Sequence, residues 1–383
     1  MNTKKYSYLT MFGHLCSDIN QGALPAILPF LVLHNGFNYT AVASLVFATN
    51  LTSALVQPLF GYLGDKVGKP WFMALGVFLA GAGLSCVGFL ENYWEVFFAV
   101  AVSGLGVALF HPEGGRIANF VAGKEKAKGM SIFAVGGNIG FAIGPIIASG
   151  AIAIWGMKGT AVLIIPASVC AIVILSQNKV LITFSKKHKT ELLTSEEKDN
   201  WRAFNLLMVV QCSRAIIYYA LTTFIPLFCV VVLMQTEAFS VSMISLFAVV
   251  GAFATLAGGR IADRYGLKKL ICATSTAIVP LIVLFALSKN IEIAIILIGC
   301  MAVGIDLAYS STIVLGQKFL PNHIGMAAGI SLGVAISVGG MATPILGLIG
   351  DNYGLEATLL CVAALSVIGA IFSYIIPKPA NDK

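Results

Sequence analysis

The sequence predicts an all-α membrane protein with twelve transmembrane helices, and two observations carry that prediction. Of its 383 residues, 58% are hydrophobic and only 11% are charged, less than half the charged fraction of an ordinary soluble domain. The apolar residues also form long continuous runs, whereas the strands of a membrane β-barrel alternate apolar and polar residues. The composition therefore excludes a soluble enzyme, a secreted disulfide scaffold and a disordered chain.

Each expected span is an apolar run long enough to cross a bilayer as a helix, which takes about 20 residues. Charged and turn residues separate twelve such runs, near 8–33, 40–63, 71–90, 96–119, 129–152, 159–177, 203–233, 240–261, 269–288, 293–316, 324–349 and 356–376. The first run shows no obvious small-residue cleavage site, so we expect it to stay in place as a span.

The basic residues sort to one side of these spans. All but three of the 24 Lys and Arg residues lie in segments on the side of the N-terminus. The exceptions are Lys158 and Lys289 in the opposite loops and Arg214 inside a span. Short cytoplasmic loops are rich in Lys and Arg, so we expect a cell-membrane protein with both termini and residues 178–201 in the cytoplasm. Topology explains the net charge of +7 better than nucleic-acid binding does.

An internal repeat divides the chain into two pseudo-symmetric six-helix halves. The sequence Gly-Tyr-Leu-Gly-Asp-Lys-Val-Gly-Lys at 61–69 is echoed by Gly-Arg-Ile-Ala-Asp-Arg-Tyr-Gly-Leu-Lys at 259–268. The expected organisation is an N-terminal half at 1–177, a charged cytoplasmic linker at 178–201 and a C-terminal half at 202–383. Repeats of this kind place a substrate site at their interface, near the bilayer midplane.

The loop Gly-x-x-x-Asp-x-x-Gly-Lys/Arg, with the twelve spans, resembles the signature of the major facilitator superfamily. Residues 110–116 (Phe-His-Pro-Glu-Gly-Gly-Arg), 135–145 and 14–18 resemble the fosmidomycin-resistance family of drug exporters. The resemblance implies the major facilitator fold and alternating access. It also implies proton-coupled export of small drug-like compounds such as phosphonate antibiotics.

The loop motif has a physical interpretation as a conformational latch. Gly61 and Gly68 permit a tight turn, Lys69 holds it at the anionic inner membrane surface, and Asp65 could accept hydrogen bonds from N–H groups at the start of a helix. Asp263 is the repeat equivalent of Asp65. The alternative is an ordinary charged turn.

A second conformational element is expected in the fifth span, where Gly140, Gly144 and Pro145 resemble an antiporter motif. Small residues on one helix face permit close and sliding contact between helices. Packing and rocking would use the same surface.

Ionisable groups inside a membrane are costly and are candidate functional sites. Asp18 lies well inside the first span, and His14, Asp18 and Gln21 fall on one helix face. We expect Asp18 to carry the coupled proton, with a purely structural Asp as the alternative. His111 is either a proton relay or a packing residue.

Arg214 occupies the corresponding position in the seventh span, with Gln211 and Tyr218 on the same face. A guanidinium group matches phosphate or carboxylate groups with two hydrogen bonds. Arg214 therefore binds an anionic substrate, pairs with a carboxylate or has a structural role, and the sequence leaves these three open.

Further candidates are Glu113, Arg116, Asp306, Asn50 and Asn138. Glu113 and Arg116 can pair on one face of the fourth span, as a gate, a proton-relay element or an ordinary ion pair at a solvated helix end. Glu113 is our second candidate for proton coupling, and Asp306, in the tenth span, is the third. The two amides are weaker candidates for substrate binding, because amides often only join helices.

These features predict a secondary active transporter and not an enzyme. No phosphate-binding loop and no catalytic or metal-binding motif is present, so we expect no cofactor and no metal. The expected partners are a small-molecule substrate, protons and the lipid bilayer, with no nucleic acid, and we expect a monomer. Proton-coupled uptake of a nutrient or metabolite is one alternative, and a non-transporting membrane receptor or scaffold is another.

Overall fold

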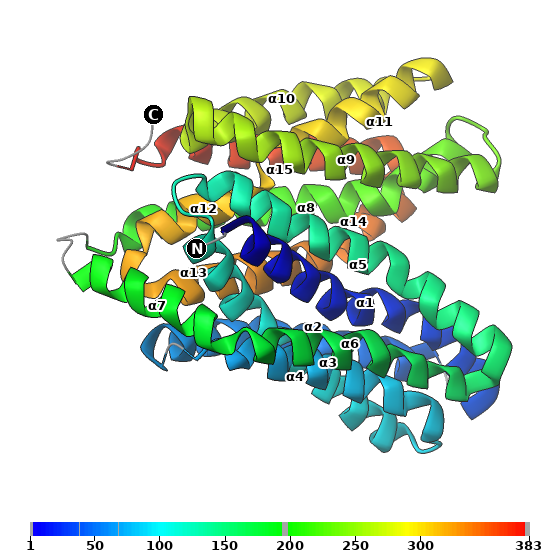
Figure 1. Ribbon diagram of the computed structural model, residues 1–383. Coiled ribbons are helices and arrows are strands. Elements are labelled where there is room, and N and C mark those ends of the chain that lie inside the picture. The colour runs from blue at the N-terminus through cyan, green and yellow to red at the C-terminus, as the bar shows by residue number, and fades with distance from the viewer. Residues whose placement is uncertain (1–2, 38, 68, 194–197, 380–383) are drawn as a thin grey trace. The chain divides into compact units, whose positions relative to one another are not determined.

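The chain is helical throughout the part that the computed structural model describes, which is residues 3–379 except 38, 68 and 194–197. No strand occurs within these residues. Figure 1 shows the helices in chain order from blue to red. All eight cysteines are free thiols.

The helices form two compact units. The first comprises Met1–Lys124, Ile132–Lys198 and Pro321–Gly333, and the second comprises Glu125–Ser131, Asp199–Leu320 and Val334–Lys383. Each unit is discontinuous in sequence: the short segment 321–333 belongs to the unit that holds the N-terminus, and the short segment 125–131 belongs to the unit that holds the C-terminus.

The first unit contains seven helices and most of an eighth, α5 (Lys126–Trp155). The seven are α1 (Thr3–Asn35), α2 (Tyr39–Val67), α3 (Trp71–Cys86), α4 (Tyr93–Val121), α6 (Ile164–Ser176), α7 (Asn178–Leu193) and α13 (Ile324–Gly329). Short 3-10 turns lie at Val87–Phe89, Gly156–Leu163 and Pro321–His323. Helices α1, α2 and α3 all pack against α4, which makes α4 the centre of this unit.

The second unit is built around α8. Its helices are α8 (Trp201–Val231), α9 (Glu237–Tyr265), α10 (Leu267–Leu287), α11 (Ile291–Asp306), α12 (Tyr309–Phe319), α14 (Ala335–Tyr353) and α15 (Leu355–Ile375). Helix α8 packs against α9, α12, α14 and α15. Gly266 and Gly354 adopt φ values of 103° and 87° in the tight turns before α10 and α15, a conformation that favours glycine.

The helices have the lengths and apolar surfaces of membrane spans. Nine stretches of the described helices are long and apolar enough to cross a bilayer, and one of them, Lys126–Ser176, has 51 residues and contains both α5 and α6. Helices α1 and α2, with 33 and 29 residues, lie outside these nine and also exceed the length of one crossing. Large apolar side chains stay exposed on outer faces, such as Ile154 at 71% and Phe253 at 68%, as lipid contact requires.

Two predicted spans are interrupted. The span expected at 293–316 is divided into α11 and α12 by a turn at Leu307–Ala308, where the backbone of α9 approaches so closely that a Cβ atom on Gly258 would collide with the Leu307 carbonyl. The span expected at 324–349 contains a π-helical turn, Ile330–Val334, between α13 and α14. Gly329 and Gly333 pack there against Gln57 of α2.

The linker predicted at 178–201 is not simply a loop. Helix α7 occupies most of it and follows α6 after a turn at Gln177 (Figure 1). Helix α7 packs against α4, and Phe184 contacts the ring of Tyr6 at a centroid distance of 5.4 Å. Residues 194–197 lie outside the described part.

Candidate transport site

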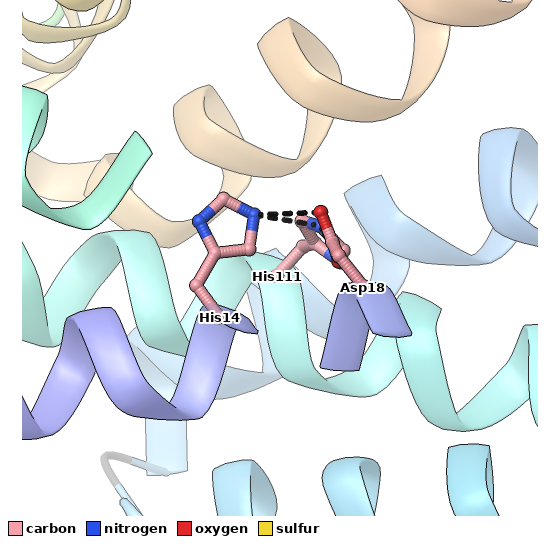
Figure 2. A group of neighbouring side chains, drawn as sticks. All are labelled: His14, Asp18 and His111. Carbon is pink, nitrogen blue, oxygen red and sulfur yellow. Dashed lines mark hydrogen bonds and ion pairs between the residues drawn. The ribbon is translucent and has the colours of Figure 1, made fainter. Parts of the chain in front are cut away.

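A buried ionisable cluster brings His14 and Asp18 of α1 beside His111 of α4 (Figure 2). Asp18 Oδ2 lies 3.2 Å from His14 Nε2, and Asp18 Oδ1 lies 3.3 Å from His111 Nε2. The two Nε2 atoms are 3.2 Å apart. Side-chain exposure is 6% for His14, 12% for Asp18 and 7% for His111, so water competes little for these groups.

Main-chain carbonyls fix the tautomers of both imidazole rings. His14 Nδ1 donates to the Phe133 carbonyl at 2.8 Å, and His111 Nδ1 donates to the Val107 carbonyl at 2.9 Å, because a carbonyl oxygen can only accept. If both rings are neutral, each Nε2 carries a lone pair. The two Nε2 atoms and the Asp18 carboxylate would then all be hydrogen-bond acceptors in contact, with no N–H or O–H donor among them. The cluster therefore needs at least one added proton.

The cluster can hold one or two added protons. With one, a protonated histidine pairs with the Asp18 carboxylate and the net charge is zero. With two, each protonated histidine pairs with a separate oxygen, His14 with Oδ2 and His111 with Oδ1. Each of the three residues also offers one possible metal-ligand atom, and these atoms lie within 4.8 Å of one another. A small metal ion is therefore the competing occupant that experiment must exclude.

Glycine on α5 makes the space for this cluster. A Cβ atom on Gly137 would lie 2.6 Å from His14 Nε2 and 2.8 Å from Asp18 Oδ2. One helical turn apart, Gly140 and Gly144 bring α5 against the main chain of α1, where a Cβ atom would collide with the carbonyls of Leu15 and Ile19. Pro145 follows within the same helix. Helices α1 and α5 are therefore in direct backbone contact beside Asp18.

Glu113 and Arg116 form a closed pair on α4. Arg116 Nε donates to Glu113 Oε2 at 2.8 Å, and Arg116 Nη2 donates to Glu113 Oε1 at 2.5 Å. Their side chains are only 2% and 4% exposed, so of the alternatives left open for this pair the structure does not show a solvated helix end. Gly64 of α2 packs on this pair, since a Cβ atom there would lie 2.8 Å from Glu113 Oε2. The position of the pair near the end of the predicted span suggested contact with water, but the packing of α2 against α4 excludes water from both side chains.

Asp65, at the end of α2, binds the start of α13. Its two carboxylate oxygens accept hydrogen bonds from the main-chain N–H groups of Gly325 at 2.8 Å and Met326 at 3.0 Å. Such N–H groups have no partner inside their own helix. Gly61 allows the two backbones to meet, because a Cβ atom there would collide with the Gly325 carbonyl.

Asp263, at the end of α9, makes the equivalent contact in the second unit. It accepts hydrogen bonds from Ala127 N at 3.1 Å and Lys128 N at 2.9 Å, in the first turn of α5. The two repeats of the loop motif thus use the same geometry. Lys69 is exposed at the turn before α3. Gly68 lies outside the described residues.

The second unit holds a looser charged pair. Arg214 of α8 lies with Nη1 3.8 Å from Oδ1 of Asp306, the last residue of α11. Its guanidinium carbon is 4.4 Å from the ring centre of Tyr309. The ring of Tyr218, one turn further along α8, lies 5.8 Å from that of Tyr219. Gly251 of α9 leaves the space that the Asp306 carboxylate fills.

A comparison with known families identifies the architecture. The family model described as Major Facilitator Superfamily matches residues 10–344. The protein belongs to the Major Facilitator Superfamily. It is therefore a multi-pass membrane transporter of small molecules and not an enzyme. Both the family and the all-helical transporter fold predicted from the sequence are confirmed.

Individual relatives and structures agree with this assignment to the Major Facilitator Superfamily. The fosmidomycin resistance protein of Escherichia coli K12 is 29% identical over 373 residues, which cover 94% of this chain and 89% of that protein. YfnC of Bacillus subtilis, an uncharacterized MFS-type transporter, is 26% identical over 98% of this chain and 94% of its own. The structure of the Escherichia coli fucose:proton symporter FucP has a TM-score of 0.76 over 99% of this chain and 100% of FucP, and its 12% identity shows the fold alone.

The remaining candidate residues, all amides, do not belong to the charged groups above within the described part of the structure. Gln21 is partly buried on α1, Gln211 is buried on α8, and Asn138 is exposed on α5. Asn50 lies in α2, and its side chain is outside the described part of the structure.

Sequence reasoning undervalued several residues that the structure brings to the charged groups. His111 stood as a packing residue or relay, although the run of polar and small residues at 111–116 in an apolar span was a usable signal. Gly64 and Gly137 lie in the motifs at 61–69 and 135–145, but nothing in the sequence placed them opposite a carboxylate, and Gly251 gave no sequence signal. A contact between helices far apart in the chain has no local pattern.

Proposed function

We propose that the protein exports small drug-like compounds, phosphonate antibiotics among them, in exchange for protons. The observation that carries the proton coupling is the cluster of His14, Asp18 and His111, whose hydrogen bonding is incomplete without an added proton. The similarity to a protein named for fosmidomycin resistance supports the direction and the substrate class.

The cluster is well situated to couple proton binding to conformational change. It joins α1 to α4, and the bond from His14 to Phe133 ties it to α5. A shift of α1 against either helix changes which atoms can share the proton. Proton occupancy and the position of α1 are then thermodynamically linked, as alternating access requires. In this proposal the Asp18 carboxylate holds the coupled proton in the cluster as its counter-charge, and the two histidines carry and relay the proton.

Glu113 is a poorer proton carrier than Asp18 on the same geometric grounds. Both of its oxygens accept hydrogen bonds from Arg116, so a proton could bind only by breaking a bidentate ion pair. We assign this pair a gating role together with Asp65. The carboxylate of Asp65 and the side chain of Arg116 both lie against Gly325.

We further propose a location in the cell membrane with both termini and the linker in the cytoplasm. The contacts of Asp65 and Asp263 would then act as cytoplasmic latches that favour one conformation of the transport cycle. Single cysteines introduced by His188→Cys and Tyr353→Cys, in a chain lacking its native cysteines, should react with an impermeant thiol reagent from opposite sides. Labelling from the same side would overturn this orientation.

Everted membrane vesicles with an acid interior test the exchange directly. We expect them to accumulate a phosphonate antibiotic, and we expect a protonophore to stop the accumulation. Asp18→Asn should abolish gradient-driven accumulation while substrate binding stays measurable, with a flattened pH dependence. Asp351→Asn, which removes an exposed carboxylate, should behave like the parent chain.

Other outcomes would contradict the proposal. Accumulation that survives collapse of the proton gradient would refute proton coupling, and full activity of Asp18→Asn would remove Asp18 from it. A transition metal that copurifies stoichiometrically and disappears in Asp18→Asn would assign the cluster to a metal instead.

Proton-coupled uptake is the second candidate, because one protein of this fold is a fucose:proton symporter. Uptake predicts that protons and substrate cross the vesicle membrane in the same direction, whereas export by exchange predicts opposite directions. A receptor or scaffold would move substrate in neither direction. Simultaneous recording of internal pH and labelled substrate separates all three.

A further inference from the structure

The ion pair between Arg214 and Asp306 is incomplete. Its closest approach of 3.8 Å is too long for a hydrogen bond. Arg214 Nε is buried and has no hydrogen-bond partner within the described residues. A guanidinium group offers five N–H donors in one plane, so this side chain has hydrogen-bonding capacity that Asp306 does not use.

The surroundings of Arg214 suit an anion better than a neutral group. Tyr309 covers one face of the guanidinium at 4.4 Å, which shields the charge from water without neutralising it. Arg214 also lines a small cavity together with the hydroxyl-bearing side chains of Ser213, Thr274 and Thr312. These three hydroxyl groups already donate to main-chain carbonyls, so the unused donor that an anion could engage belongs to Arg214. A buried arginine with unused donors beside a small polar cavity is a suitable partner for a phosphonate or carboxylate group.

Asp306 is held where it competes for the same cation. The turn at Leu307–Ala308 ends α11 directly after it, and Thr255 of α9 donates to its main-chain carbonyl at 3.3 Å. Its side chain lies against Gly251, where a Cβ atom would collide with Oδ2. The carboxylate thus remains near Arg214 and forms only a loose pair with it.

We propose that Arg214 binds the anionic group of the transported substrate, a phosphonate, phosphate or carboxylate, and that Asp306 is an internal anion displaced by it. Without substrate, Asp306 partly compensates the buried cation. A substrate anion replaces the loose 3.8 Å contact with short bidentate hydrogen bonds. This inference assigns the residues that recognise the anionic group of the cargo, and it rests on the proposed function only in taking the ligand to be the cargo.

Equilibrium binding to the purified full-length chain tests the proposal without any proton gradient. The probes are phenylphosphonate, benzoate and the neutral analogue benzamide, measured by calorimetry. We expect phenylphosphonate and benzoate to bind and benzamide not to bind. Their relative affinities show which anion the site prefers. Arg214→Gln should weaken anion binding at least about tenfold, as expected for the loss of charge-assisted hydrogen bonds.

Asp306→Asn gives the distinctive result. Removing a competing internal anion should strengthen phenylphosphonate binding by about threefold or more. A purely structural pair predicts the reverse, because the site would lose its shape. Arg214→Lys keeps the charge but not the planar donor group, so we expect intermediate affinity.

A double variant guards against misfolding as the cause of lost binding. Arg214→Gln combined with Asp306→Asn leaves no unpaired buried charge, so it should unfold at a temperature close to that of the parent and still fail to bind anions. The proposal is overturned if the parent binds neither anion, if Arg214→Gln binds them normally, or if Asp306→Asn weakens binding.

Failure of this inference is distinguishable from failure of the proposed function. Asp18→Asn should still bind phenylphosphonate, with the flattened pH dependence stated above, because Asp18 is not among the residues around Arg214. Anion binding without proton-driven transport would refute only the coupling. Proton-driven transport with normal anion binding by Arg214→Gln would refute only the role of Arg214.

Discussion

Arg116 and Arg214 both lie in membrane-spanning helices beside a carboxylate, yet the two pairs are bonded very differently. Arg116 donates to both oxygens of Glu113 at 2.8 and 2.5 Å, three residues away on the same helix. Arg214 approaches Asp306 of another helix no closer than 3.8 Å. A bidentate pair on one helix is fixed by local geometry, whereas a pair joining two helices depends on how the helices pack.

The difference separates structural from ligand-binding roles for the same two residue types. A saturated buried pair can accept a ligand only by breaking two charge-assisted hydrogen bonds. An unsaturated pair can exchange its weak internal contact for a better external one. We therefore expect Glu113 and Arg116 to contribute to stability and gating, and Arg214 and Asp306 to contribute to recognition.

The largest expected effect comes from breaking the closed pair. Glu113→Gln leaves Arg116 as a buried uncompensated cation, which should lower the free energy of unfolding by about 3–5 kcal/mol. Asp306→Asn should lower it by well under half as much, because Asp306 makes no short hydrogen bond to Arg214. Thermal unfolding of the detergent-solubilised protein measures both changes. Replacing both partners, Glu113→Leu with Arg116→Met, should recover much of the loss. Equal destabilisation by Glu113→Gln and Asp306→Asn would remove the distinction between the pairs.

A smaller effect is expected from filling the space opposite a carboxylate. A Cβ atom on Gly137 would press on His14 and Asp18, and one on Gly251 would press on Asp306. Overpacking of this kind costs about 1–3 kcal/mol. We expect Gly137→Ala to slow proton-driven transport with little change in anion affinity, and Gly251→Ala to change anion affinity.

Matched glycines provide the control for these two substitutions. Gly150 lies in α5, as Gly137 does, and Gly347 lies in α14 of the second unit. A Cβ atom on either residue would meet nothing within 4 Å. Their replacement by Ala should leave both transport and anion binding unchanged. If Gly137→Ala and Gly251→Ala had the same pattern of effects, the proposed division of labour between the two units would be wrong.

The smallest effects are expected at the two latches, where one carboxylate binds two helix N–H groups. Asp65→Ala should destabilise the start of α13, and Asp263→Ala the start of α5, each by about 0.5–2 kcal/mol, the usual value of a helix cap. Hydrogen–deuterium exchange should rise at 324–326 in the first variant and at 126–128 in the second. Unchanged exchange in both would show that the contacts carry no stabilisation.

Much of the fold could be predicted because lipid-facing helices need continuous apolar runs. The run predicted at 203–233 is α8 at Trp201–Val231, and that at 356–376 is α15 at Leu355–Ile375. The breaks at Leu307–Ala308 and Ile330–Val334 were missed, because they lie in stretches as apolar as an unbroken helix. They depend on close approach to α9 and α2, which hydropathy does not encode.

The candidate site divides in the same way. Its ionisable members were found because charge inside an apolar run is conspicuous in one dimension, as for Asp18, Arg214 and Asp306. The contact between His111 and Asp18 was not found, because His111 lies 93 positions beyond Asp18 and reaches it only through the packing of α1 on α4.

The sequence by itself determined the number and order of the spans and the positions of the buried charges, because the cost of polar groups in lipid acts on each segment separately. The tertiary structure decided which charges are neighbours. Packing placed Asp18 against two histidines, removed the water from Glu113 and left Arg214 with unused donors. Those distances depend on contacts between helices remote in the chain, and hydrogen bonds are sensitive to shifts of less than 1 Å.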